Sequence, residues 1–264
     1  MNQYQSIAEI KDYAKDRLAG RFSNSAILTL LNTGIVFGIT FLISTVISTL
    51  TLSVSLVTTG ELDTGKLSIS AILGIGLLQY LLTLLCSIFT GIFNTGISLY
   101  FLNLASGRNA TLGNLYYGFQ YLYKKSLALS AVTVLISSVC LLPYDIFYFL
   151  YSNKIPGNWD ICMIIAMVAG MAVYVPISLS LSQAFFLLLD FPTRSPKELL
   201  SLSIRLMKGR KWKLFKLQLS FLPLMILGVL SFGIGNLWIT PYMNMTMALY
   251  FLDIMKSGDT ASDS

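Results

Sequence analysis

The sequence contains no histidine, and only 11% of its 264 residues are charged. The missing histidine excludes Ser-His-Asp triads, Cys-His dyads, HExxH zinc sites and histidine proton relays. The low charge is equally informative, because a soluble domain has about 25% charged residues. Since 55% of the residues are hydrophobic, the chain cannot make a water-soluble surface, and lipid must cover much of it.

Cysteine is also scarce. Cys86, Cys140 and Cys162 lie in or at the ends of apolar stretches and show no CxxC spacing. This pattern indicates small apolar side chains rather than a disulfide framework or a metal site. The sequence has no phosphate-cradling glycine loop and no paired carboxylates. We therefore expect no catalytic residue, no metal and no cofactor, and we expect that the protein is not an enzyme.

Six apolar stretches are long enough to cross a bilayer, which requires about 20 mostly apolar residues. They predict an all-α, polytopic membrane bundle of about six helices that forms a single domain. A glycine-rich bend, Phe232–Asn236, separates the last two stretches. The expected spans are residues 25–57, 67–104, 127–150, 159–189, 214–231 and 237–255.

The basic residues are distributed unequally between the two sides of this bundle. Sixteen of the eighteen lysines and arginines fall on the side of the termini, and Lys66 and Lys154 are the other two. Lysine and arginine next to membrane spans are enriched in the cytoplasm. The bias predicts a multi-pass protein of the cytoplasmic membrane with both termini inside. Anionic lipid headgroups are the expected partner of these cations, rather than nucleic acid.

Two amphipathic helices are expected at the cytoplasmic surface, over residues 6–19 and 196–208. Each begins with a capping box, Ser6 with Glu9 and Ser195 with Glu198, and Gly209 is suited to end the second helix. We expect both helices to lie in the interface plane with their basic residues toward headgroups. A docked membrane-protein partner is the alternative. The interfacial basic cluster comprises Lys208, Arg210, Lys211 and Lys213.

The chain also suggests a three-fold repeat of a basic segment, an outward helix and an inward helix. Helix-breaking residues Gly96, Pro176 and Pro241 would kink the inward helices at equivalent places. Converging kinked helices can enclose a binding site, which Asn94, Gln183 or Asn244 would line. Chance similarity between apolar segments, and a helix that simply continues past the headgroups, remain the alternatives.

Three segments resemble one uncharacterised bacterial family, the domain of unknown function 975, found mainly in Firmicutes. They are Ile10–Gly20, Leu206–Phe215 followed by Leu219–Phe221, and Leu237–Tyr242 followed by Thr246–Tyr250. Leu222-Pro223 departs from the Gly-Trp pair that the family tends to have there. The resemblance implies a multi-helix protein of the bacterial cytoplasmic membrane. It implies no activity and no site residues.

Three functions remain open at this point. The first is a non-enzymatic envelope accessory, scaffold or regulatory component, which the basic surface helices favour. The second is a small transporter or export permease component, which a central polar cavity would favour. The third is a lipid-modifying enzyme that uses Asp145, Asp190 and Asp253, although these carboxylates are scattered over different spans.

Overall fold

The computed structural model describes residues 6–60, 68–153 and 155–262, and within those ranges it contains helices and no strand. Five helical segments are long and apolar enough to cross a membrane, which confirms the all-α membrane fold. These segments are Phe22–Thr59, Ile69–Ala105, Tyr123–Ser152, Trp159–Asp190 and Lys211–Leu230. The helices are α1 (Ile7–Leu18), α2 (Phe22–Thr59), α3 (Ile69–Thr90), α4 (Phe93–Ala105), the 3-10 helix η2 (Leu112–Tyr116), α5 (Tyr117–Gln120), α6 (Tyr123–Ser152), α7 (Trp159–Leu181), α8 (Ala184–Asp190), α9 (Pro196–Leu206), α10 (Lys211–Leu219), α11 (Leu222–Leu230) and α12 (Asn236–Ser262).

Helices occupy all six stretches that the sequence marks as apolar, but five rather than six qualify as spans. The stretch 237–255 forms most of α12, which is less apolar than the others. Much of α12 is buried inside the protein, including Met245, Ala248 and Phe251. The buried apolar side chains of this stretch therefore contact protein instead of lipid. Lys66, Leu67 and Lys154 lie outside the described residues.

The helices form two compact units. Unit 1 combines the chain up to Thr33, the segment Gly91–Leu129 and the chain from Ile177 onward. Unit 2 combines Gly34–Thr90 with Ser130–Pro176. The sequence predicts a single domain because almost all of its length is used in apolar spans, and the helices α2 and α7 run continuously from one unit into the other.

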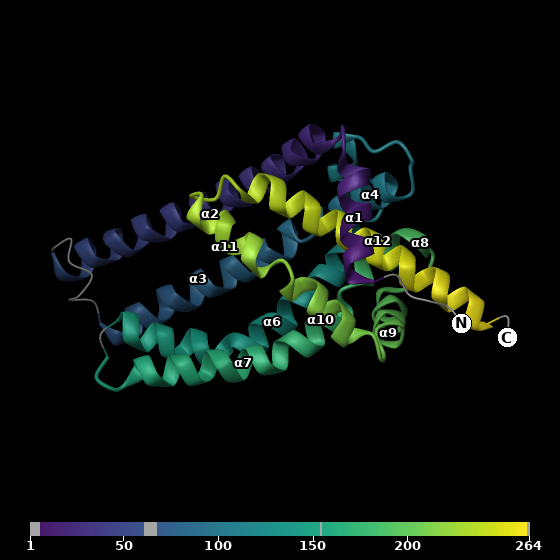
Figure 1. Cartoon of the computed structure of the whole chain (residues 1–264). Coiled ribbons are helices and arrows are strands. Elements are labelled where there is room, and N and C mark those ends of the chain that lie inside the picture. The colour runs from purple at the N-terminus through teal and green to yellow at the C-terminus, as the bar shows by residue number, and fades with distance from the viewer. Residues whose placement is uncertain (1–5, 61–67, 154, 263–264) are drawn as a thin grey trace. The chain divides into compact units, whose positions relative to one another are not determined.

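The core of unit 1 forms where α4, α8 and α12 meet. α4 contacts both α8 and α12, and Figure 1 shows α12 passing beside α4 and α8. Tyr100, Phe101 and Phe251 are almost completely buried. The rings of Phe186 and Phe251 stack with their centroids 5.2 Å apart. Close packing of large aromatic side chains gives this unit a core of the kind that soluble domains have.

Amphipathic segments cover these three core helices. α1 packs on α12 and α4, η2 and α5 pack on α4, and α9 packs on α8. The capping boxes of α1 and α9 are confirmed, with both reciprocal hydrogen bonds present. Gly209 follows α9 with a φ of 78°, as a helix-ending glycine requires. The apolar face of α1, formed by Ile10, Ala14 and Leu18, is fully buried by protein.

The proposed repeat is visible as a common spacing in the three core helices. Gly91, Pro176 and Pro241 each precede a buried phenylalanine by ten residues, respectively Phe101, Phe186 and Phe251. The covering segments do not follow a one-to-one pattern, because α1 packs on both α12 and α4, and η2 and α5 also pack on α4. Gly91, rather than Gly96, occupies the position that corresponds to the two prolines.

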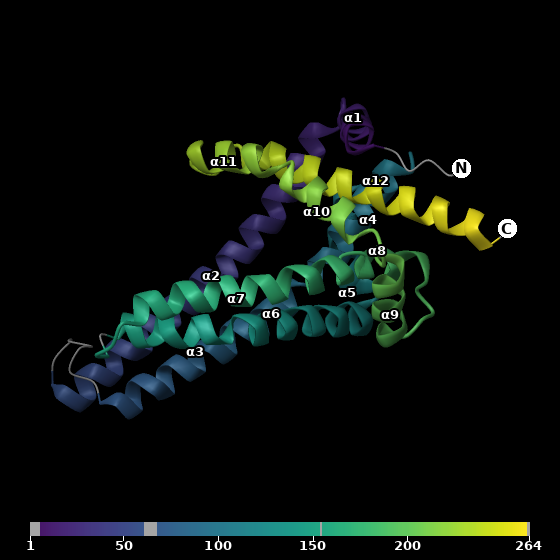
Figure 2. The ribbon, with the colours of Figure 1, turned by 60° about the horizontal axis from the view of Figure 1, so that its bottom comes forward.

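Unit 2 consists of the membrane-exposed parts of α2, α3, α6 and α7. α3, α6 and α7 run side by side in both ribbon views (Figures 1 and 2). Glycines allow close approach: a Cβ at Gly76 of α3 would lie 2.5 Å from the Phe149 ring of α6. A Cβ at Gly170 of α7 would lie 2.6 Å from the Cys140 carbonyl oxygen. Few described side chains of this unit are buried, so lipid must cover its outer faces.

Candidate functional site

Two facing helix surfaces in unit 2 carry polar side chains at helical spacing. Ser138, Asp145 and Ser152 of α6 follow one another at intervals of seven residues. This interval is about two helical turns, so the three side chains lie on one face of the helix. On α3, Gln79, Thr83 and Ser87 recur every four residues. Both helices lie in stretches apolar enough to span a membrane. The polar faces can therefore avoid lipid by facing each other.

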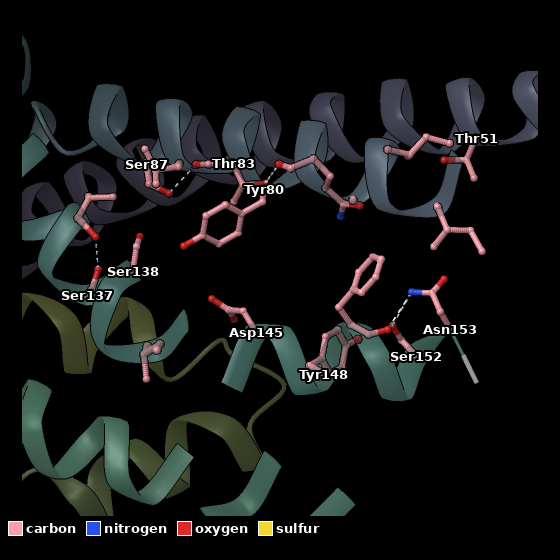
Figure 3. Close-up of a pocket in the computed structure, with 18 residues that line it drawn as sticks. Thr51, Tyr80, Thr83, Ser87, Ser137, Ser138, Asp145, Tyr148, Ser152 and Asn153 are labelled. Carbon is pink, nitrogen blue, oxygen red and sulfur yellow. Dashed lines mark hydrogen bonds between the residues drawn. The ribbon is translucent and has the colours of Figure 1, made fainter. Parts of the chain in front are cut away.

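These surfaces line an open cavity of about 840 Å³. Figure 3 shows polar side chains of α3 on one side and of α6 on the other, with Asp145 and the Tyr80 ring directed into the space between them. The cavity is large enough for a drug-sized molecule, since ligand pockets measure about 300–1,000 Å³. The lining residues are Thr51, Ile72, Ile75, Gly76, Gln79, Tyr80, Thr83, Leu84, Ser87, Val134, Ser137, Ser138, Leu141, Asp145, Tyr148, Phe149, Ser152 and Asn153.

Most of the cavity hydroxyl groups donate their hydrogen to the backbone of their own helix. Thr83 donates to the Gln79 carbonyl at 2.9 Å, and Ser87 to the Thr83 carbonyl at 2.9 Å. Ser137 donates to the Val134 carbonyl at 2.8 Å, and Ser152 to the Phe149 carbonyl at 3.1 Å (Figure 3). A hydroxyl has one hydrogen and two lone pairs. Once the hydrogen is used, the oxygen remains only as an acceptor, so the cavity wall is rich in acceptors.

Asp145 is the one carboxylate among the described residues that line the cavity. It lies on α6, half-buried, two residues after the helix-internal Pro143. Among the described residues, no basic side chain forms an ion pair with it. An ionisable group in a membrane span is costly and usually serves a function. An acceptor-rich cavity with one carboxylate favours a ligand that carries positive charge and N–H donors.

The three polar residues that the sequence suggested for a cavity all lie in unit 1, and none lines this cavity. Asn94 is exposed on α4, and Asn244 is half-exposed on α12. Gln183 lies between α7 and α8 and is fully buried. Its Nε2 donates to Ser182 Oγ at 2.9 Å, while its Oε1 has no partner.

The residues suggested as kinks lie inside continuous helices. α7 continues through Pro176 and α12 through Pro241. The chain breaks between helices at Gly91-Ile92, Ser182-Gln183 and Ser220-Phe221. Gly96 has a packing role, because a Cβ there would lie 2.2 Å from the Leu115 carbonyl oxygen of η2. The missing side chain lets the α4 and η2 backbones touch.

The basic cluster at the start of α10 is partly engaged by α12. Lys213 forms an ion pair with Asp253 at 3.1 Å. The Tyr250 hydroxyl donates to the Arg210 carbonyl at 3.2 Å. Lys208 is exposed, and Lys211 is half-exposed. Within the described part of the chain, no three histidine, cysteine, aspartate or glutamate side chains are grouped to hold a metal ion.

Sequence reasoning missed the cavity although its signal is present in the chain. The polar residues of α6 lie at positions that a 3.6-residue period places on one face, and those of α3 do the same. Individually, each serine or threonine in a span is explained by a hydrogen bond to its own helix. The two stripes become a site only because α3 and α6 are neighbours.

Comparison with known proteins identifies the family. The family model described as "Protein of unknown function (DUF975)" matches residues 1–258. The chain belongs to this family. The match covers both units up to the last turn of α12, which agrees with the resemblance seen at the two ends of the sequence. No curated protein and no solved structure matches the chain.

Proposed function

We propose that this DUF975 protein is a non-enzymatic membrane protein that binds a small organic cation in the cavity of unit 2, as a transporter or permease component does. The observation that carries the proposal is the cavity itself. It places a single carboxylate, Asp145, among hydroxyl oxygens that act as acceptors. Binding a cation there offsets the cost of holding a carboxylate in a membrane span.

The aromatic side chains of the cavity support the same ligand class. Tyr80, Tyr148 and Phe149 line it together with Asp145. Aromatic faces attract cations at distances up to about 6 Å. A planar aromatic cation with amino groups would combine ring contacts, donation to hydroxyl oxygens and pairing with the carboxylate. This arrangement supports recognition without any bond being made or broken, because general acid-base chemistry needs convergent titratable groups.

We also propose a bacterial cytoplasmic membrane location with both termini in the cytoplasm. The unequal distribution of lysine and arginine supports this orientation. It puts the end of α6 that carries Ser152 and Asn153 toward the outside. The cavity would then accept its ligand from the external face.

The decisive experiment measures binding of ethidium, an aromatic cation with two amino groups, to the purified protein. Ethidium fluorescence rises when the dye leaves water, so one titration gives Kd. We expect Asp145→Asn to weaken binding at least tenfold, or about 1.4 kcal/mol. Asp160→Asn is the matched control, because Asp160 is exposed at the start of α7 and does not line the cavity.

Transport is tested with the same variants in proteoliposomes. The wild type and Asp160→Asn should move ethidium across the vesicle membrane, and Asp145→Asn should not. Equal Kd values for the wild type and Asp145→Asn would refute cation binding by this cavity. Binding without movement would support a receptor or regulatory protein rather than a transporter.

A second candidate is an envelope accessory or scaffold protein, and the surface around α9 and α10 favours it. Exposed Lys208 and Trp212 lie there beside exposed Ile204 of α9. Such a mixed basic and apolar surface suits anionic headgroups or a membrane-protein partner. This candidate predicts that Lys208→Gln with Lys211→Gln changes the size of the native complex in a mild detergent. Ethidium binding would be the same in that double variant as in the wild type.

A further inference from the structure

The apolar hairpin near the C-terminus, residues 222–238, has almost no protein cover on its outer side. It consists of α11, the turn 231–235 and the start of α12 (Figure 1). Phe232 at the tip is 98% exposed, and Val229 is 73% exposed. The other large exposed side chains are Leu222, Met225, Ile226, Leu227, Leu230, Ile234 and Trp238. This surface must contact something apolar.

The depth of the hairpin is fixed by its contacts with α1. The Lys11 ammonium donates to the Ser220 hydroxyl at 3.1 Å and the Ser220 carbonyl at 3.3 Å, just before α11. The Tyr242 hydroxyl donates to the Lys11 carbonyl at 3.3 Å. Ser220 and Tyr242 therefore lie at the level of α1.

α1 lies at a polar surface. The face away from the core carries Asp12, Lys15 and Asp16, which are exposed. Lys15 and Asp12 form an ion pair at 3.1 Å with both side chains more than half exposed. Such a charged face belongs in water or among headgroups, not in hydrocarbon. Ser220 and Tyr242 are consequently at the edge of the membrane.

From that edge, the hairpin is too short to cross the membrane. The eleven residues from Ser220 to Ser231 span about 16 Å, and the six from Tyr242 back to Asn236 about 9 Å, at 1.5 Å per helical residue. The hydrocarbon core is about 30 Å thick. Lys211–Leu230 as a whole is long and apolar enough to cross a membrane. However, its first half, α10, carries Lys211, Lys213 and Lys216, and Ser220 at the end of α10 is already at the level of α1. The tip therefore reaches roughly the middle of the bilayer.

The backbone of the tip is suited to hydrocarbon, where an unpaired polar group is costly. Each N–H group from Ser231 to Ile239 donates to an acceptor within the hairpin. The Ser231 hydroxyl donates to the Gly228 carbonyl and accepts from the Gly235 N–H, both at 2.8 Å. Gly228 lets the two arms approach, because a Cβ there would lie 2.3 Å from Asn236 Oδ1. A turn in water would not need such complete pairing.

We propose that residues 222–238 form a re-entrant hairpin that inserts into one leaflet and returns without crossing. The partner that it fits is the acyl-chain region of that leaflet, with anionic headgroups around its base. Lys208, Lys211 and Lys216 lie at that base, and the Lys216 ammonium is 5.5 Å from the centre of the Trp212 ring. Tryptophan and lysine are typical anchors at membrane interfaces. The assignment to the cytoplasmic leaflet rests on the orientation proposed above. The insertion depth of the hairpin does not depend on that orientation.

Single cysteines test the proposal in full-length protein whose three native cysteines are replaced by alanine. In intact cells, a membrane-impermeant maleimide should not label Phe232→Cys, before or after permeabilisation. A hairpin that crosses would be labelled from outside, and a hairpin in water would be labelled after permeabilisation. Either result would overturn the proposal. Val229→Cys serves as a second probe if the Phe232 variant does not fold.

A spin label at the same positions measures depth in vesicles that contain anionic lipid. The label at Phe232→Cys should lie at least about 10 Å deeper than one at Lys208→Cys, given the length of the arms. Spin–spin broadening at Phe232→Cys would show that a second copy covers the tip, which would contradict the proposed lipid contact. Gly157→Cys reports orientation separately, because it should be labelled from outside. If only that control fails, the orientation is wrong and the inserted hairpin stands.

Discussion

Replacing Phe251 by alanine should destabilise the protein far more than replacing Phe37, although both phenylalanines lie in apolar helices. Phe251 is completely buried in the core of unit 1 and stacks on Phe186. Phe37 of α2 is 68% exposed, and its ring centroid lies 6.2 Å from that of Phe41. The difference between the two sites is therefore the cavity that the substitution leaves.

The expected magnitude follows from burial. Removing a buried phenylalanine side chain costs about 3–5 kcal/mol, because apolar contacts are lost and a cavity remains. At roughly 2–4 °C per kcal/mol for a protein of this size, Phe251→Ala should lower the melting temperature by about 6–20 °C. Phe37→Ala should change stability by less than about 0.5 kcal/mol, since lipid or detergent fills the space.

The assay is the loss of the monodisperse size-exclusion peak after heating in a mild detergent, with each variant compared with the wild type. The conservative variant Phe251→Leu is the matched control, and its melting temperature should lie between those of Phe251→Ala and Phe37→Ala. If Phe37→Ala and Phe251→Ala lower the melting temperature equally, unit 1 lacks the packed aromatic core described above. The assignment of α12 as a protein-covered helix would then also be wrong.

Two further predictions concern local packing and pH. Gly96→Val should prevent folding, because the new side chain would overlap the η2 backbone, whereas Gly34→Val should be tolerated because nothing lies within 4 Å of a Cβ there. Resistance to protease in detergent distinguishes the two variants. Equal protease resistance of the two variants would contradict the α4–η2 contact. Hydrogen bonds from the Ser6 backbone N–H and with the Ser6 side chain hold the pKa of Glu9 below its ordinary value of 4.5. The carboxylate therefore stabilises the folded α1 above about pH 4.5 and loses this effect as pH falls through the lower folded-state pKa. The melting temperature of Glu9→Gln should thus be lower than that of the wild type at pH 7 and converge with it in acid; a constant difference would refute the capping box as its cause.

The contrast between α12 and α2 shows where sequence reasoning stops. Both are apolar, and composition alone places both in lipid. α2 is long, and much of its surface is exposed, including Phe37 and Phe41. In α12, Met245, Ala248 and Phe251 are covered by other helices. Hydrophobicity reports that a side chain avoids water, but it does not report whether lipid or protein replaces the water.

The sequence by itself determined the all-helical membrane class, the approximate location of the apolar helical stretches, both capping boxes and the close of α9 at Gly209. These features depend on composition, apolar runs and short-range hydrogen bonds, which are local. Only the tertiary structure decided that the serines of α6 face Gln79, Thr83 and Ser87 of α3 around Asp145. The same holds for the contacts of α1 with both ends of the last hairpin. Those facts depend on which helices are neighbours, and contacts between residues far apart in the chain have no period or motif that a single sequence reveals.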